Sequence, residues 1–169
     1  APLNFVASVI VILKALSIPC GRSYIVPYTV IKNPLKLMKF FLEKRITITF
    51  LTPSYVRKIG NKTGPFLRML FVGSEPANNI YNKNLTLINI YACSESGFAV
   101  GTFEIDQSYE VCPVGKPEVS TEIKLLDENG KVVPEGETGE LCFENPYVRG
   151  YINLPEETEK AFKNGIYHS

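Results

Sequence analysis

Two nearly continuous apolar segments constrain the fold of this chain more than any other feature. Residues 67–72 and 85–91 carry apolar side chains at most positions, without the strict alternation of a strand that has one face in water. Such runs are typical of parallel strands that are covered on both faces. Residues 46–51 form a third segment of this kind, rich in β-branched and aromatic side chains and ended by Pro53. A helical pattern that ends near Arg45 separates this third segment from a short predicted strand at residues 23–26, and strands separated by helices predict βαβ units.

The helical patterns come early in the chain. Residues 6–16 are apolar all round, which predicts a buried helix. Asn33 and Pro34 have the residue types of a helix cap and a first-turn proline, and an apolar stripe follows them as far as about Arg45. Residues 23–26 are predicted to form a short strand.

The pattern changes after Gly101, where short strands alternate with turns. Residues 121–126 alternate, and Asn129-Gly130 is a strong hairpin dipeptide. Residues 140–144 predict another strand, and residues 156–162 a short helix. We therefore predict an α/β fold in which residues 1–100 form a parallel sheet with flanking helices. Residues 101–169 would form a small β-rich subdomain, or half-barrel.

Composition limits the classes of function. Hydrophobic residues make up 45% of the chain and charged residues 21%, as in a globular protein. The net charge is +1 with no basic block, which gives no support to a nucleic-acid or membrane partner. The longest apolar stretch, residues 5–13, falls short of the roughly 20 residues that cross a bilayer. The chain does not open with Met, so we expect its natural N-terminus to lie upstream.

The four cysteines are Cys20, Cys93, Cys112 and Cys142. None belongs to a C-x-x-C pair, and the only histidine, His168, is far from them in sequence. This spacing predicts no zinc site. It favours four reduced, mostly buried thiols in a cytoplasmic protein.

Three loops follow the predicted strands, where ligands bind in parallel α/β sheets. They are residues 73–76, 91–97 and, as a weaker candidate, 52–55. In the second loop Glu95 is a hard oxygen ligand suited to Mg²⁺. Ser94 can donate to a phosphate, and Tyr91 offers a ring face to a base. Residue types alone leave open whether this is a magnesium–nucleotide site or an ordinary polar loop.

Several motifs resemble those of adenylate-forming enzymes. Residues 89–95, Asn-Ile-Tyr-Ala-Cys-Ser-Glu, resemble their N-x-Y-G-P-T-E signature. Further matches are an L-R…G-G-E segment (67–75), a G-x-P turn (114–117), a G-E-L…R-G-Y element (139–151) and the opening of Y-x-T-G-D (167–169). Their order and spacing resemble those of the amino-acid adenylation domains of nonribosomal peptide synthetases.

The resemblance implies a reaction and its cofactors, ATP and Mg²⁺. A carboxylate would attack the α-phosphate of ATP to give an acyl-adenylate and pyrophosphate. Ser94 and Glu95 would be catalytic, with Ser94 on the α-phosphate and Glu95 on the metal. The implied nucleotide contacts are Gly73, Ser74, Glu75, Asn89, Tyr91 and Ser94. The partners would be a small-molecule acid and ATP, and in the parent enzyme a carrier-protein domain.

The resemblance also implies an acyl pocket made entirely of apolar side chains. Its matched positions are Val6, Ala7, Ile10, Phe50, Leu70, Val72, Ile90, Phe98 and Ala99. Val6 replaces the aspartate that binds the substrate's α-ammonium in the family. Either the substrate lacks that charge or the pocket is no longer used, and simple packing of these side chains in a core is an equal alternative.

The chain departs from the family in other ways. It lacks the family's glycine-rich phosphate loop, the aspartate that follows Ser169 and the lid that carries the catalytic lysine. Ala92 and Cys93 replace the usual Gly-Pro. We therefore expect a fragment of an AMP-forming ligase that is inactive alone and that self-associates through exposed apolar surface. Two alternatives stay open, a fragment of an acyl- or aryl-CoA ligase and a degenerate binding module without catalysis.

Overall fold

The computed structural model describes residues 6–97, 99–117, 122–144 and 148–169. The chain divides into two compact units. Unit 1 comprises Ala1–Ala92 and Gly101–Lys116, and unit 2 comprises Cys93–Val100 and Pro117–Ser169. Residues 101–116 thus pack with the first unit, although the sequence analysis groups them with the second. The chain crosses from one unit to the other within the segment that carries the signature motif.

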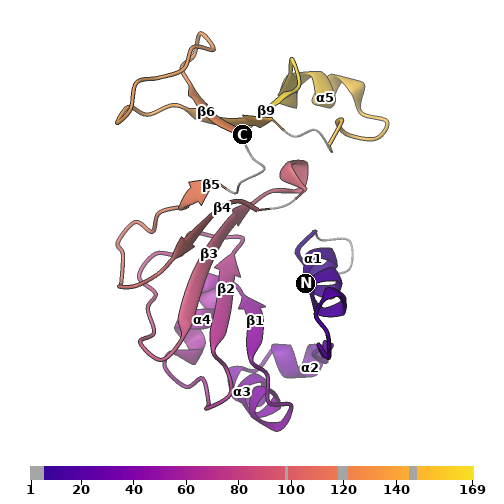
Figure 1. Cartoon of the computed structure of the whole chain (residues 1–169), viewed down its shortest axis with the longest axis vertical. Helices are drawn as coiled ribbons and strands as arrows, with labels where there is room; N and C mark the ends of the chain where they lie inside the picture. Colours follow the sequence, from indigo (N-terminus) through magenta and orange to yellow (C-terminus); the bar gives the residue numbers. More distant parts are fainter. Residues whose placement is uncertain (1–5, 98, 118–121, 145–147) are drawn as a thin grey trace. The chain divides into compact units, whose positions relative to one another are not determined.

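A five-stranded sheet has the order β1-β2-β3-β4-β5 (Figure 1). Its strands are β1 (Ile48–Leu51), β2 (Met69–Gly73), β3 (Thr86–Ala92), β4 (Ala99–Glu104) and β5 (Lys116–Pro117). The first three are parallel, with Phe50 beside Phe71 and Gly73 beside Ile90. The apolar segments of the sequence are therefore parallel strands, as predicted.

The predicted strand at residues 23–26 is wrong, because residues 21–27 have no regular structure. Ile25 is 92% exposed, and only Val26 of this segment packs against the core, so most of the segment lacks the burial that a strand inside a sheet would have. Helix α2 (Tyr28–Ile31) follows instead.

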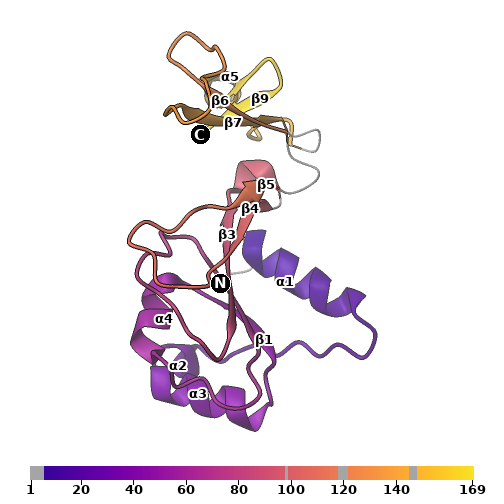
Figure 2. The same ribbon diagram turned by 60° about the vertical axis from the view of Figure 1, so that its left-hand side comes forward.

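Helices α3 (Pro34–Glu43) and α4 (Pro53–Ile59) lie on one face of the sheet (Figures 1 and 2). As predicted, Asn33 caps α3, where its Oδ1 accepts hydrogen bonds from the backbone N–H groups of residues 35 and 36 at 2.9 and 3.1 Å. Leu37 and Phe41 of α3 enter one apolar core with Leu70 and Val72 of β2. This core fixes the strand ends from which the candidate loops leave.

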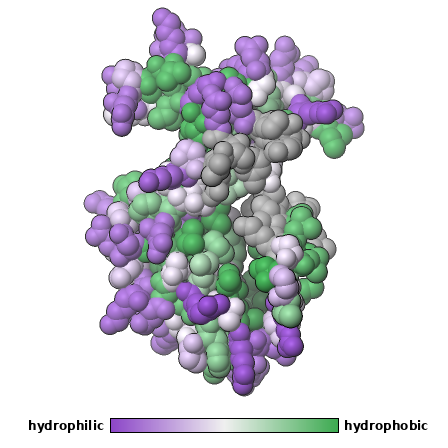
Figure 3. Space-filling model, in the orientation of Figure 1, coloured by the Kyte–Doolittle hydropathy of each residue, from purple (hydrophilic) through white to green (hydrophobic). Residues whose placement is uncertain are grey.

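Helix α1 (Val6–Ser17) lies on the other face of the sheet in both ribbon views. The helix is present as predicted, but those of its side chains that the structure describes are not buried as predicted. Leu13 is 60% exposed and Leu16 is 77% exposed. Figure 3 shows apolar residues at the surface of this helix. Within the described residues, no helix is both long and apolar enough to span a membrane.

Unit 2 contains an antiparallel sheet of order β6-β7-β9-β8. Its elements are β6 (Glu122–Leu126), β7 (Glu140–Glu144), α5 (Pro155–Ala161), β8 (Phe162–Lys163) and β9 (Ile166–His168). The rings of Phe143, Tyr167 and Phe162 pack in sequence, with centroids 5.0 and 5.2 Å apart. After the predicted hairpin turn at Asn129-Gly130, the chain pairs back through an isolated antiparallel bridge between Leu126 and Val132. The whole is the α/β fold with a small β-rich part that the sequence predicts.

Candidate functional site

The signature loop leaves β3 and turns through a short 3₁₀ helix, η1 (Ser94–Ser96). Ser96 is fully buried, and its Oγ donates to the carbonyl of Cys93 at 2.7 Å. The same Oγ accepts from the N–H of Cys93 at 3.3 Å. The side chain of Ser96 thus fills the inside of the turn. Ser94 is exposed and Glu95 is partly exposed.

Glu95 is held by Tyr151, a residue 56 positions further along the chain. The Tyr151 hydroxyl donates to Oε1 of Glu95 at 2.7 Å. This hydrogen bond, ahead of burial, raises the pKa of Tyr151 to about 12. The phenol therefore keeps its proton, and can donate it to Glu95, further into the alkaline range than an ordinary tyrosine.

Tyr151 is itself fixed by α5. Its backbone N–H donates to Oγ1 of Thr158 at 2.8 Å, and Thr158 donates to the carbonyl of Leu154 at 2.8 Å. The preceding Gly150 has φ 131°, and a Cβ at that position would lie 2.2 Å from Cγ2 of Thr158. The R-G-Y element thus needs glycine to admit Thr158 and tyrosine to reach Glu95.

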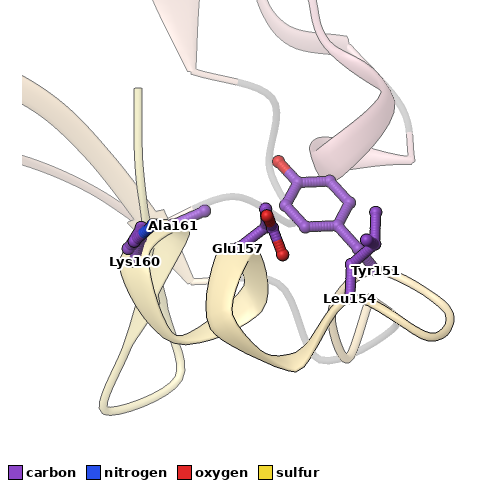
Figure 4. A pocket seen from close by; sticks show the side chains of 5 residues that line it. All are labelled: Tyr151, Leu154, Glu157, Lys160 and Ala161. Carbon is purple, nitrogen blue, oxygen red and sulfur yellow. The ribbon is translucent and has the colours of Figure 1, made fainter.

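A shallow hollow of about 390 Å³ lies beside this tyrosine. It is lined by Tyr151, Leu154, Glu157, Lys160 and Ala161 (Figure 4). Its lining comes from α5 and the turn before it. The R-G-Y element is visible in the sequence, but the contact of Tyr151 with Glu95 and the role of Thr158 are not.

The loop after β2 contains the predicted Gly73, Ser74 and Glu75. A Cβ on Gly73 would lie 2.6 Å from the carbonyl oxygen of Ile90 on the neighbouring strand β3. Only glycine therefore fits at this position. Ser74 is exposed and has φ 71°, a left-handed conformation that costs an L-residue about 1–2 kcal/mol.

Glu75 is engaged by the first turn of α4. Its Oε1 accepts from the N–H of Ser54 at 3.1 Å and from the Ser54 hydroxyl at 2.6 Å. These hydrogen bonds lower the pKa of Glu75. The structure thus brings together two of the three predicted loops, 73–76 and 52–55, and the second of these is the start of a helix.

Asn89 and Tyr91 alternate on β3 and so lie on the same face of that strand. Asn89 is buried, and its Nδ2 donates to the carbonyl of Pro113 at 2.9 Å. Tyr91 is partly buried. Asn89 thus anchors the segment that leads into the predicted G-x-P turn.

The structure does not bring all of the predicted pocket residues to one surface. Leu70 and Val72 are fully buried in the core with α3 and α4. Strand alternation places Phe50 and Ile90 on the opposite face of the sheet, both next to Gly73. Ala99 is partly buried at the start of β4.

The other four of the nine pocket positions lie outside what the structure describes. Phe98 is not among the described residues. Val6, Ala7 and Ile10 belong to α1, but their side chains are also outside the described part of the structure.

Comparison with known proteins agrees with these motifs. Residues 1–152 match the family model described as "AMP-binding enzyme". The chain belongs to this family. It is 34% identical over 151 residues to gramicidin S synthase 2 of Brevibacillus brevis, covering 82% of this chain and 3% of that one. It is 31% identical over 128 residues to bacitracin synthase 1 of Bacillus licheniformis, covering 75% and 2%.

A second branch of the AMP-binding family is also similar. A medium/long-chain-fatty-acid–CoA ligase of Mycobacterium tuberculosis is 28% identical over 152 residues, covering 81% of this chain and 27% of the ligase. The structure of a nonribosomal peptide synthetase protein with adenylation and PCP domains superposes with a TM-score of 0.82 at 22% identity. That match covers all of this chain and 38% of the other, and it shows the fold. The chain thus spans a small part of these relatives.

Mg²⁺ is the metal that the resemblance of the motifs implies, and the described residues offer it a suitable ligand. Mg²⁺ usually takes one or two protein carboxylates and completes its coordination with phosphates and water. Glu95 offers one hard carboxylate on a partly exposed loop, with Tyr151 to orient it. This donor set suits a metal that is shared with a bound nucleotide.

Proposed function

We propose that this chain is part of an AMP-forming ligase that activates a carboxylic or amino acid with ATP. Family membership and the similarity to peptide synthetases support this proposal. The observation that carries it is the contact between Tyr151 and Glu95, which holds the signature-loop carboxylate in one orientation. A location in the cytoplasm is part of the proposal.

In this proposal Glu95 would bind Mg²⁺, which when bound neutralises charge on the phosphates. Tyr151 orients Glu95, and exposed Ser94 donates to the α-phosphate. The acid's carboxylate then attacks the α-phosphate and pyrophosphate leaves, so catalysis depends on position and charge neutralisation.

The chain would supply only part of this site, since it spans 38% of the adenylation–PCP neighbour. We therefore expect the 169 residues alone to be inactive, because residues that act as a unit lose nearly all rate when members are missing. The parent enzyme would pass its product to a carrier-protein domain, since that neighbour carries a PCP domain beside its adenylation domain.

An acyl-CoA ligase is the second candidate. The similarity to a fatty-acid–CoA ligase favours it, as does Val6 at the position of the ammonium-binding aspartate. The higher identity to gramicidin S synthase 2 favours the amino-acid branch. A module that has lost catalysis is a third candidate.

The test is to trap acyl-adenylates with hydroxylamine in the full-length parent protein, with ATP, Mg²⁺ and a panel of acids. Acid-dependent hydroxamate supports the ligase, and subsequent thioester formation on CoA or on a carrier domain separates the two branches. Nucleotide binding without hydroxamate from any acid would favour the non-catalytic module.

A further inference from the structure

Three side chains that bind transition metals meet on the sheet of unit 2. Glu140 and Cys142 belong to β7 and His168 belongs to β9. Cys142 and His168 are direct partners in the register of these strands, so their side chains share a face. Glu140 precedes Cys142 by two residues and therefore lies on that face too. Figure 2 shows the two strands side by side.

The distances between the ligand atoms are close to those of a tetrahedral site. Nδ1 of His168 lies 3.4 Å from Sγ of Cys142 and 2.8 Å from Oε2 of Glu140. Sγ and Oε2 are 3.9 Å apart. Tetrahedral bonds of about 2.3 Å to sulfur and about 2.1 Å to nitrogen and oxygen place ligand atoms about 3.6 Å apart when sulfur is included. The same bonds place nitrogen and oxygen about 3.4 Å apart.

The separation of the histidine nitrogen and the carboxylate oxygen has to change most, widening by about 0.6 Å on those bond lengths, whereas the two distances from sulfur change by about 0.3 Å or less. The Glu140 side chain can provide this movement because it is 43% exposed, whereas that of His168 is 15% exposed. Cys142 is fully buried. The exposed side of Glu140 leaves a path for the metal and for a fourth, water ligand.

The charges around the cluster are compatible with a cation. Lys124 lies beside Cys142 on the neighbouring strand β6. Its ammonium, however, pairs with Glu122 and Glu144 at 3.4 and 3.0 Å. Lys163 acts electrostatically on Glu140 and Cys142 and opposes the cation. Two anionic ligands, a thiolate and a carboxylate, outweigh that one ammonium.

We propose that Glu140, Cys142 and His168 bind one zinc ion that joins β7 to β9. The mixture of sulfur, nitrogen and oxygen ligands favours zinc over the harder magnesium and calcium ions. The sequence prediction of no zinc site misses this cluster, because the sheet brings together residues 26 positions apart.

Metal binding would release the thiol proton of Cys142 to solvent as the sulfur–metal bond forms. Zinc affinity should therefore increase with pH.

The test uses reduced, metal-free chain titrated with Co²⁺ and then Zn²⁺. We expect a thiolate-to-cobalt absorption band that saturates at one equivalent and disappears when Zn²⁺ is added. Cys142→Ser should abolish the band. Cys112→Ser, which removes a partly buried thiol of unit 1, and Cys20→Ser, which removes an exposed one, should leave it unchanged.

His168→Gln is a second variant, which removes the imidazole ligand and leaves the buried thiol of Cys142 in place. It should weaken binding by more than about tenfold, since even groups behind a ligand have effects of that size. It should also abolish the rise in melting temperature that Zn²⁺ gives the unsubstituted chain. Absence of the band in the unsubstituted chain, its persistence in Cys142→Ser, or its loss in either control would overturn the proposal.

Discussion

Replacing Tyr151 by phenylalanine would remove one oxygen and leave the ring in place. The ring packs edge-on against Phe162, with centroids 5.9 Å apart, so the substitution keeps this contact. What is lost is the 2.7 Å hydrogen bond from the hydroxyl to Oε1 of Glu95. The variant therefore tests whether that bond orients the carboxylate.

The size of the effect follows from the exposure of the pair. A hydrogen bond to a charged group contributes about 1.5–3 kcal/mol to stability when it is shielded. Tyr151 and Glu95 are both only partly buried, so water replaces part of the lost bond. We expect a net cost of about 1 kcal/mol, which corresponds to about a fivefold change in an equilibrium or a rate.

The assays are urea unfolding of the chain and ATP–pyrophosphate exchange by the full-length parent. Tyr81→Phe serves as the matched control, because Tyr81 is 46% exposed and lies in unit 1. We expect Tyr151→Phe to lower both stability and exchange by about these amounts and Tyr81→Phe to change neither. Equal behaviour of the two variants would refute the positioning role.

The pH dependence provides an independent check. The folded pKa of Tyr151, about 12, lies above its ordinary value of 10.0. A raised pKa gives stability that is complete below the ordinary value and is lost as pH rises through the folded value. Spectrophotometric titration should show a tyrosine that ionises near pH 12 in the unsubstituted chain and is missing from Tyr151→Phe.

Three further predictions concern other parts of the chain. Ser74→Gly should raise the free energy of unfolding, measured in urea, by about 0.5 kcal/mol, because φ 71° suits glycine, while the control Ser94→Gly should give no gain; equal stability of Ser74→Gly and the unsubstituted chain would contradict this. Because Val6 stands in place of an aspartate, the parent should prefer an acid without an α-ammonium, since burying that charge unpaired costs about 3–5 kcal/mol. A substrate screen in which a standard amino acid gives the highest kcat/KM would contradict this. The chain should self-associate through α1 and the edge strand β1, and Leu13→Lys should shift it toward monomer in sedimentation. Sedimentation of the unsubstituted chain as a monomer would disprove this.

Local patterns were sufficient to predict the parallel strands and the cap of α3. A strand buried on both faces must be apolar nearly throughout, and Asn33 followed by proline is a strong helix start. Helix α4 was missed because Pro53 was interpreted only as the end of a strand. Proline at a first helical position is equally common, and Val56 and Ile59 have the spacing of a buried helical face.

The contacts that define the sites could not be predicted in the same way. Tyr151 meets Glu95 across 56 positions, and His168 meets Cys142 across 26. Such pairs depend on strand register and on the path of a loop, neither of which leaves a periodic signal. The predicted burial of α1 is too high for a related reason. An apolar helix needs a surface to pack against, but its composition does not show whether this chain supplies that surface.

The central claim is that Glu95 binds the metal of an AMP-forming ligase, and ATP–pyrophosphate exchange by the full-length parent tests it most directly. Glu95→Gln keeps the acceptor for Tyr151 but removes the charge. We expect it to lower acid-dependent exchange by about 100-fold or more, because a neutral amide is a poor magnesium ligand. The matched control Glu128→Gln, in an exposed turn, should retain full exchange. Equal exchange by both variants, or no exchange with any acid, would contradict the account.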